Sequence, residues 1–329
     1  MHDLQFCTKC SQLPSFLSIQ VYAMAGWSFS DIPSQRGRSA VVTGVGGLGY
    51  ETALALARAG GEVILAGRSP AKGQAAVAQI KGLVPAADIR FEVLDLASLA
   101  SVAAFSDRML AARQSLDLLL NNAGVMAVPQ RQTTADGFEL QFGTNYLGHF
   151  ALTAHLLPLL RQGRDARVVN LASLAHRGGR IHFDDLQWTR RYQPWPAYQQ
   201  SKLAMLMFAL ELQRRSDAAG WGLMSNAAHP GYARTELIAK GPGDSSPFAL
   251  MGRLIAPIFS HSAAEGALPT LFAATAPQAA KGGYYGPDGF QELKGPPKPA
   301  QIMPQAKDTA ASARLWEVSE QLTAVKFSG

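Results

Sequence analysis

One stretch decides the fold, Thr43-Gly44-Val45-Gly46-Gly47-Leu48-Gly49, which lies between a short apolar run and a helix-like run over 50–59. Gly44, Gly46 and Gly49 have the spacing G-x-G-x-x-G at a strand-to-helix junction. The first glycine allows a tight turn, the second lets the backbone approach a pyrophosphate, and the third lets helix and strand pack closely. The helix N-terminus would offer free N–H groups and the positive end of its dipole to phosphates. The stretch therefore predicts a dinucleotide site.

Strand-like runs alternate with helical patterns along the rest of the chain, which is typical of βαβ units around a parallel sheet. We predict strands at 39–43, 62–67, 89–95, 116–121, 167–172, 223–228 and 283–285. Helices are predicted at 49–59, 71–81, 99–113, 137–160, 198–219, 263–274 and 307–322. The pattern indicates an α/β protein: a single-domain, doubly wound Rossmann fold of about seven parallel strands, with helices on both faces.

The composition limits the function classes. A chain of 329 residues, 47% hydrophobic and 16% charged, can bury a sizeable core. It has no run of 18 apolar residues, so the sequence predicts no membrane span. Lys and Arg exceed Asp and Glu, 30 to 24, but no block of like charges interleaves with aromatic residues, which argues against a nucleic-acid partner. Two cysteines suit a cytoplasmic protein. They form a C-x-x-C pair, which supplies only two of the four ligands that a structural zinc site needs, so we predict no metal.

Domain boundaries can also be read from the sequence. Residues 1–36 differ from the rest, and we expect a leader there that is disordered, or that is not native before Met24. The predicted dinucleotide-binding domain then covers 37–329. Two long irregular stretches, 175–197 and 232–260, follow predicted strand ends, where ligands bind in open α/β sheets. We interpret both as substrate loops.

A tyrosine and a lysine supply the strongest chemical signal. Tyr198 and Lys202 are four residues apart on a predicted helix, so both side chains lie on one face. Free tyrosine has a pKa of about 10, and a neighbouring ammonium group lowers that pKa by favouring the tyrosinate. Such a pair is common by chance. It gains weight from Ser173, after a predicted strand, and from Asn145, inside the preceding predicted helix.

Over about residues 37–325 the chain resembles the short-chain dehydrogenase/reductase family. Within that family it is most similar to the retinol-dehydrogenase-like and protochlorophyllide-reductase-like branch. The resemblance rests on the glycine turn, Asn121-Asn122-Ala123-Gly124, Asn145, Ser173, Tyr198-x-x-x-Lys202 and Pro230-Gly231. Stretches 143–150, 174–177 and 181–186 are similar to the branch. One departure stands out: the turn reads T-G-x-x-G-x-G, one residue shorter than the T-G-x-x-x-G-x-G usual in the family.

The resemblance implies a role for each catalytic candidate. Tyr198 would be the general acid/base, and Lys202 would lower its pKa and hold ribose hydroxyls. Ser173 would polarise the substrate oxygen, and Asn145 would anchor a water for proton transfer. The implied reaction interconverts a hydrophobic alcohol and its aldehyde or ketone by hydride transfer. Two alternatives stay open: reduction of a carbon–carbon double bond on the same fold, and a non-catalytic protein that senses NADP(H).

Cofactor choice follows from the chemistry behind the turn. An NAD site has a carboxylate about 20 residues after the glycines, at the end of the second strand, where it binds the ribose hydroxyls of the adenosine. Here Gly67 holds that position, followed by Arg68, with Lys72 one helical turn further on. Since Arg68 can bind a 2′-phosphate bidentately, NADP(H) is favoured and NAD(H) is the alternative. The predicted cofactor residues are Thr43, Gly44, Gly46, Gly47, Leu48, Gly49, Arg68, Lys72, Asp95, Leu96, Asn122, Ala123, Gly124, Tyr198, Lys202, Pro230, Gly231 and Thr235.

Apolar side chains in both long loops favour a small hydrophobic substrate. The residues that we expect to form the substrate wall are His182, Trp188, Trp195 and Tyr232. Family members commonly pair through the helices that correspond to 137–160 and 198–219. The resemblance therefore implies a homodimer or homotetramer.

Overall fold

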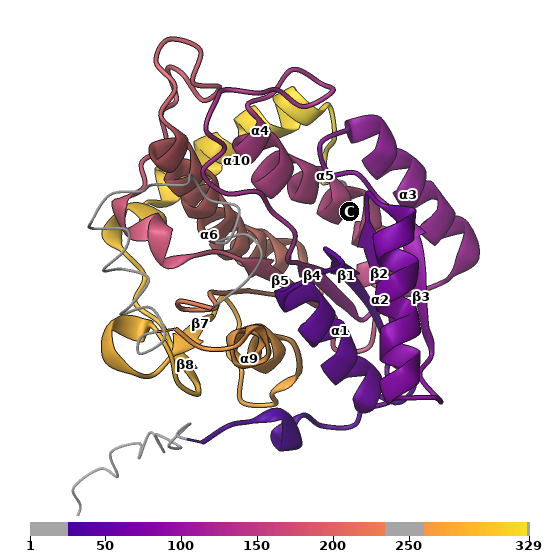
Figure 1. The fold of residues 1–329 in the computed structure, drawn as a ribbon. Helices are drawn as coiled ribbons and strands as arrows, with labels where there is room; N and C mark the ends of the chain where they lie inside the picture. Colours follow the sequence, from indigo (N-terminus) through magenta and orange to yellow (C-terminus); the bar gives the residue numbers. More distant parts are fainter. Residues whose placement is uncertain (1–25, 234–259, 328–329) are drawn as a thin grey trace, which may run out of the picture.

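A single twisted sheet forms the centre of the molecule in the computed structural model, which describes residues 26–233 and 260–327 (Figure 1). Its eight strands run in the order β3-β2-β1-β4-β5-β6-β7-β8, and the chain turns back between β1 and β4. Neighbouring strands from β3 to β7 pair in parallel, and β8 pairs antiparallel with β7. The strands are β1 (Ser39–Thr43), β2 (Glu62–Gly67), β3 (Ile89–Val93), β4 (Leu118–Asn121), β5 (Arg167–Leu171), β6 (Met224–Ala228), β7 (Tyr284–Pro287) and β8 (Pro297–Pro299).

Helices cover both faces of the sheet, as the doubly wound prediction requires (Figure 1). One layer contains α1 (Leu48–Arg58), α2 (Pro70–Leu83) and α9 (Ala263–Thr275). The opposite layer contains α3 (Leu99–Ala112), α5 (Gly148–Leu160), α6 (Pro194–Ala219) and α10 (Thr309–Thr323). In the described part of the chain, no helix combines the length and the apolar character that a membrane span needs.

Burial on both faces explains the apolar central strands. Val41 and Leu119 point into the core under α3, α5 and α6, whereas their neighbours Val42 and Leu120 point into the core under α1 and α9. Successive side chains of a strand alternate between faces, so a strand covered on both sides must be apolar at every position. The seven predicted parallel strands are confirmed to within two residues at each end.

The eighth strand was not predicted, because its sequence has no alternation of apolar and polar residues. Its sequence is Pro297-Lys298-Pro299, and it pairs with β7 at the edge of the sheet. Proline lacks an N–H donor and is tolerated in strands at such edges. Three residues with two prolines do not have the sequence pattern of a strand.

The helix predicted at 137–160 consists of three consecutive helical segments. The short helix α4 (Leu140–Phe142) leads into a π-helical turn, η2 (Gly143–Leu147), which continues as α5. A π-turn is rare, and it often lies at a functional site. This one contains Asn145.

Part of the predicted leader packs on the domain. Trp27 is buried, and its ring meets the ring of Phe272 on α9 edge-on at 5.3 Å between centroids. The backbone N–H of Gln35 donates to the carbonyl of Ala59 at 2.8 Å. Trp27 and Gln35 therefore pack on the domain from within the range predicted as a leader, and the leader itself stays a prediction. Met24, Cys7 and Cys10 lie outside the described residues.

Helix α10 covers faces of α5 and α6, the helices through which we expected subunits to pair. Trp316 of α10 is 2% exposed and lies against Phe150 of α5 and Phe208 of α6, with ring centroids 5.1 and 5.8 Å away. The hydroxyl groups of Tyr146 and Ser319 are 2.7 Å apart beneath it. Within one chain these faces are already occupied, so pairing would have to use other surface. The oligomeric state stays a prediction.

We expect Trp316→Ala to lower the free energy of unfolding by about 3–5 kcal/mol, because a buried indole is replaced by a cavity. Urea or guanidinium titration measures the change. The control is Leu83→Ala, at an exposed position, which should change stability by less than about 0.5 kcal/mol. Equal stability of Trp316→Ala and the wild type would show that α10 does not hold α5 and α6.

Candidate active site

A cavity of about 240 Å³ opens at the carboxyl ends of the strands, where the sheet order reverses between β1 and β4. That is the position at which open α/β sheets bind ligands. The cavity collects residues from five separate parts of the chain. Those named by the sequence prediction are Gly44, Arg68, Lys72, Asp95, Leu96, Ala123 and Gly124. Lining residues that the prediction missed include Val45, Ser69, Val125 and Thr144.

One buried hydroxyl joins the glycine turn to the end of β4. Thr43 Oγ accepts hydrogen bonds from the backbone N–H groups of Asn122 and Ala123 at 2.9 and 3.0 Å. The side-chain amide of Asn122 donates back to the Thr43 carbonyl at 2.7 Å. These bonds bring two predicted cofactor segments together, although nearly eighty residues separate them in the sequence.

The glycine turn has the geometry of a phosphate cradle. Gly44 has φ +91° and Gly47 has φ +51°, which favour glycine. A Cβ on Gly49 would lie 2.1 Å from the Gly44 carbonyl oxygen, so this position admits no side chain. A Cβ on Gly46 would meet nothing within 4 Å, which leaves its backbone open. Gly47 provides no side-chain cap for α1, so the first N–H groups of the helix lack one. The turn fits a dinucleotide despite its shortened spacing.

The far end of the cavity is positively charged. Arg68 follows β2, and Lys72 lies in the first turn of α2, after the N-cap Ser69. Neither cation has an ion-pair partner among the residues that the structure describes. In addition, Thr144 Oγ lines the cavity, buried and without a partner. An unpaired guanidinium and an unsatisfied hydroxyl are the features that an anionic, hydroxyl-rich cofactor would satisfy.

The structure brings Asn145 and Lys202 together around Gly124. A Cβ on Gly124 would lie 3.0 Å from Asn145 Oδ1 and 3.7 Å from Lys202 Nζ. The Lys202 ammonium donates to the Leu171 carbonyl at the end of β5, at 2.8 Å. Its nitrogen lies 5.9 Å from the centre of the Tyr198 ring. Lys202, predicted to share a helix face with Tyr198, therefore meets the loop that follows β4.

Asn145 is fixed by its side chain and by its main chain. Its amide donates to the Val125 carbonyl and to Ser201 Oγ, both at 2.9 Å, and its Oδ1 accepts from the Val125 N–H at 2.7 Å. The Asn145 carbonyl lies 2.8 Å from His149 Nδ1. His149 Nε2 lies 2.9 Å from Thr43 Oγ.

His149 was missed by the sequence prediction, although its spacing of four residues from Asn145 on a helix was a usable signal. Burial lowers the pKa of His149 to about 4, so the ring is neutral near pH 7. A carbonyl can only accept, so Nδ1 carries the proton and donates to Asn145. Nε2 then accepts from the Thr43 hydroxyl. One imidazole thus links the glycine turn to the π-turn.

Burial governs the proton chemistry of Tyr198. The side chain is 5% exposed, and burial raises its pKa to about 12, against the effect of a hydrogen bond with the Ser173 side chain. The expected lowering of this pKa by Lys202 is not found. Burial disfavours the phenolate, and the Lys202 ammonium is directed at the Leu171 carbonyl instead. Burial also lowers the pKa of Lys202, to about 8.

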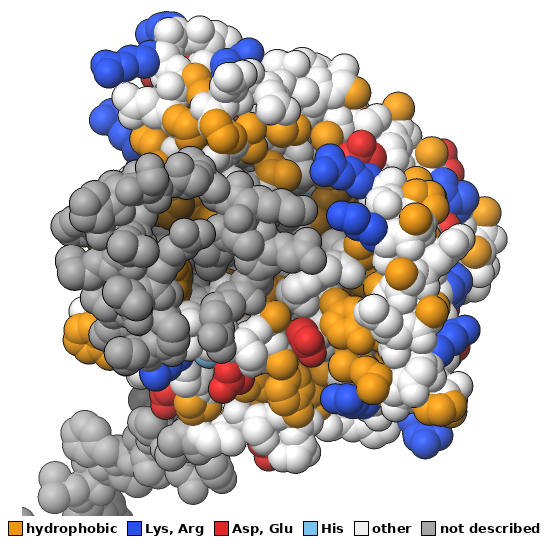
Figure 2. Space-filling model, viewed as in Figure 1, with side chains coloured by type: hydrophobic (Ala, Val, Ile, Leu, Met, Phe, Trp, Pro, Cys, Tyr) orange, Lys and Arg blue, Asp and Glu red, His pale blue; other side chains and the backbone are white. Residues whose placement is uncertain are grey.

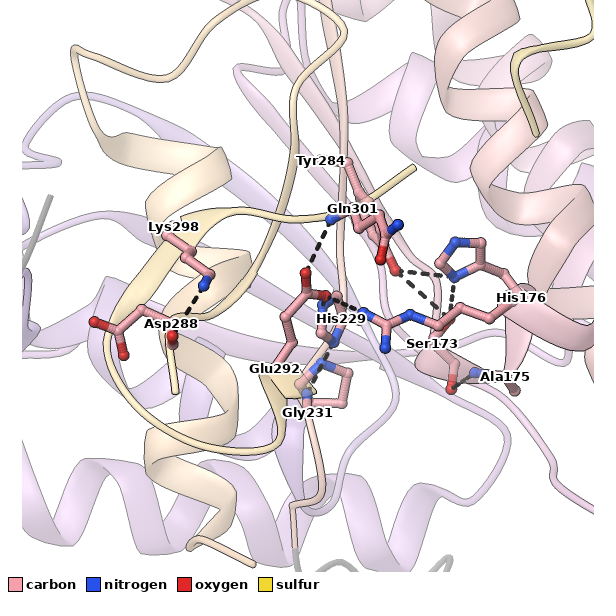
Figure 3. Close-up of polar contacts among 12 residues, drawn as sticks. Ser173, Ala175, His176, His229, Gly231, Tyr284, Asp288, Glu292, Lys298 and Gln301 are labelled. Carbon is pink, nitrogen blue, oxygen red and sulfur yellow. Dashed lines mark hydrogen bonds and ion pairs between the residues drawn. The ribbon is translucent and has the colours of Figure 1, made fainter. Parts of the chain in front are cut away.

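Ser173 begins the 3₁₀ turn η3 (Leu174–Gly178), where its Oγ accepts from the Ala175 N–H at 3.1 Å. Its carbonyl lies 2.7 Å from His176 Nδ1 and 3.5 Å from the Tyr284 hydroxyl (Figure 3). Ser173, the predicted catalytic serine, is therefore held at the end of β5 by contacts with η3 and with Tyr284 of β7.

The structure separates the predicted substrate residues. Trp195 begins α6 and lies over Tyr198, with ring centroids 5.4 Å apart, while 49% of its surface stays exposed. Trp188 is buried against His182 at 4.9 Å between ring centroids, and no contact of either residue with Tyr198 is found within the described structure. Tyr232 is partly exposed and follows Gly231. Thr235 and most of the predicted loop 232–260 lie outside the described residues.

The predicted loop 175–197 is anchored beside the site. Tyr192 donates to the Val128 carbonyl at 2.7 Å and accepts from the Gln141 amide at 3.0 Å. Gln187 accepts from the N–H of Glu139 at 2.7 Å. The loop that leads to Trp195 is therefore held in place at both Tyr192 and Gln187.

On the face shown in Figure 2, the described Lys and Arg side chains form small separate groups among hydrophobic and neutral ones.

Comparison with known proteins agrees with this geometry. A family model described as short chain dehydrogenase matches residues 38–242. Retinol dehydrogenase 13 from Homo sapiens is 42% identical over 297 residues, which cover 88% of this chain and 86% of that protein. Polyprenol dehydrogenase from Mus musculus is 41% identical over 298 residues, 89% of this chain and 85% of that protein.

A solved structure of an uncharacterised protein from Mycobacterium paratuberculosis superposes with a TM-score of 0.77 at 42% identity, over 93% of this chain and 100% of that one. These similarities extend beyond the glycine turn to nearly the whole length of the chain. The predicted family is confirmed: the chain belongs to the short-chain dehydrogenase family and is retinol-dehydrogenase-like in sequence.

Proposed function

We propose that this protein is an NADP(H)-dependent oxidoreductase that interconverts a hydrophobic alcohol and its aldehyde or ketone by hydride transfer. The observation that supports it most is the meeting of Lys202, Asn145 and Gly124, with the Lys202 ammonium over the buried ring of Tyr198. Tyr198 in turn shares a hydrogen bond with Ser173. From the cysteine content we expect a cytoplasmic protein.

The proton chemistry rests on Tyr198 and Ser173. A pKa of about 12 keeps Tyr198 a neutral phenol near pH 7, so it can donate its proton to a carbonyl oxygen that becomes an alcohol. Ser173 would hold that oxygen by a hydrogen bond. The Lys202 ammonium would favour the phenolate that remains. A nicotinamide cofactor bound in the cavity would supply or accept the hydride.

The nucleotide half of the cofactor would lie over Gly44 and Arg68. The start of α1, which has no side-chain cap, suits a pyrophosphate, and the Arg68 guanidinium, without an ion-pair partner in the described part of the chain, suits a 2′-phosphate. Pro230 and Gly231, after β6, would border the nicotinamide end.

We expect Tyr198→Phe to lower carbonyl reduction about 10²–10⁴-fold while NADPH binding is retained, because the substitution removes the proton donor and keeps the ring. Steady-state oxidation of NADPH with aldehydes, ketones and enones measures it. The control is Tyr146→Phe, which removes another buried hydroxyl, one that lies against Ser319 of α10. Turnover that survives in Tyr198→Phe would refute the assigned acid. Reduction of an enone at its double bond would favour the C=C reductase, and tight NADPH binding without any turnover would favour the sensor.

Arg68→Ala should weaken NADPH binding about 10–100-fold and change NADH binding little, because it removes a charge-assisted contact to the 2′-phosphate alone. Calorimetric titration with both cofactors measures the difference. Arg58→Ala, at the exposed end of α1, is the control and should change neither. Equal loss for both cofactors would contradict the assigned contact.

Trp195 is the substrate-wall residue that the geometry supports, because it is half-exposed beside Tyr198. Trp195→Ala should raise the KM for a long-chain aldehyde about tenfold, through loss of about 1–2 kcal/mol of apolar contact. The KM for a short aldehyde, measured on the same variant, should stay nearly unchanged. An equal rise for both would place Trp195 outside the substrate wall.

A further inference from the structure

A buried carboxylate beyond the assigned catalytic residues joins three separate segments (Figure 3). Glu292 lies in the 3₁₀ turn η4 (Phe290–Glu292), and its Oε2 lies 2.8 Å from Arg177 Nη2 and 3.0 Å from His229 Nε2. Its Oε1 accepts from the Gln301 N–H at 3.0 Å. One side chain therefore takes donors from the loop after β5, from the end of β6 and from the segment after β8.

The carboxylate decides which nitrogen of His229 carries the proton. Against burial, the hydrogen bonds from His229 and the Gln301 N–H, together with the Arg177 guanidinium, lower the pKa of Glu292 to about 2 and keep it ionised. An ionised carboxylate only accepts, so His229 Nε2 must donate to it. His229 is fully buried, and burial lowers its pKa, so the ring is neutral and Nδ1 is an acceptor. That acceptor lies 3.2 Å from the N–H of Gly231.

The Pro230-Gly231 turn, which donates this bond, is also held by its other contacts. Gly231 has φ +64°, and a Cβ there would lie 2.3 Å from the Leu293 carbonyl oxygen. The same oxygen accepts from the Tyr232 N–H at 2.8 Å. His229 itself is wedged over β7, because a Cβ on Gly286 would lie 1.9 Å from Nε2. The Pro230-Gly231 turn therefore lies directly on the segment that carries Glu292.

The backbone at Glu292 is strained. Gln291 and Glu292 have φ +53° and +61°, a left-handed conformation that residues other than glycine seldom adopt. Two adjacent residues of this kind persist only where surrounding contacts hold them, and such strain tends to gather at functional sites. Here the strained pair aims the carboxylate at His229.

We propose that Glu292 is a positioning residue for the reaction: through His229 it fixes the Pro230-Gly231 turn against which the nicotinamide half of the cofactor binds. The proposal rests on the proposed function. Arg177 extends the effect to the serine side, because it belongs to the turn η3 that Ser173 begins. Glu292 touches no reacting atom and acts through the imidazole.

Glu292→Gln changes the proton pattern while it keeps the shape. The amide presents an N–H₂ group where a carboxylate accepted three donors, so one of those donors loses its acceptor. His229 is then free to adopt the other tautomer, with its proton on Nδ1. An Nδ1–H group facing the Gly231 N–H places two donors against each other, which pushes the turn away.

The test compares NADPH with 2′,5′-ADP, which carries the adenosine and its 2′-phosphate but no nicotinamide. Calorimetric titration of Glu292→Gln should give a Kd for NADPH about tenfold or more above that of the wild type. The Kd for 2′,5′-ADP should stay within about twofold, because the Arg68 end of the cavity is distant from the change. If Glu292→Gln fails to fold, His229→Phe replaces it, because it keeps a ring and removes both nitrogens. It should also weaken NADPH binding while the Kd for 2′,5′-ADP stays nearly unchanged.

The control is Glu211→Gln on α6, where another buried carboxylate binds two guanidinium groups, those of Arg214 and Arg215. It should bind both ligands as the wild type does, at whatever cost in stability. Equal weakening for NADPH and 2′,5′-ADP in Glu292→Gln, a similar split in Glu211→Gln, or unchanged NADPH binding in Glu292→Gln would each overturn the proposal. A wild-type protein that binds neither ligand would refute the proposed function itself, and the positioning role with it.

Discussion

The site depends on one buried hydroxyl at the point where the sheet order reverses. Thr43 Oγ accepts the N–H groups of Asn122 and Ala123 and donates to His149, so it ties the ends of β1 and β4 to α5. In a parallel sheet, the ends of adjacent strands carry backbone groups that the ladder leaves unpaired, and a buried group of this kind must find a partner. Thr43 meets this need for three segments at once. The glycine turn, the loop with Gly124 and the π-turn with Asn145 therefore keep fixed positions relative to one another.

Burial then sets the chemistry of the residues held there. A phenol and an ammonium group in dry surroundings both resist their charged forms, which raises the pKa of Tyr198 and lowers that of Lys202. Burial, and not the helical spacing of the two residues, decides the direction in which the pKa of Tyr198 moves. Tyr198 is consequently a neutral phenol near pH 7, the form that the proposed proton donor needs. The same low-dielectric site strengthens each hydrogen bond made to a reacting oxygen.

The part of the chain after β6 adds two constraints that the alternating pattern does not contain. Helix α10 covers α5 and α6 with Trp316, so the hydrophobic side of these helices is satisfied within one chain. The edge pair β7–β8 carries the strained turn with Glu292 back toward Pro230 and Gly231. The far end of the sheet is thus tied to the nicotinamide side of the proposed site.

The sequence by itself determined the fold class, seven parallel strands and the family, because each of these depends on residues that are close along the chain. Glycine spacing marks a strand-to-helix turn, and Tyr198 and Lys202 share a face through helical periodicity alone. The tertiary structure decided what depends on distant segments: the link from Thr43 through His149 to Asn145, the packing of residues 26–36, and the contact of His229 with Glu292, 63 residues away. It also decided the direction of the Tyr198 pKa, since burial exists only once strands and helices have closed around the side chain.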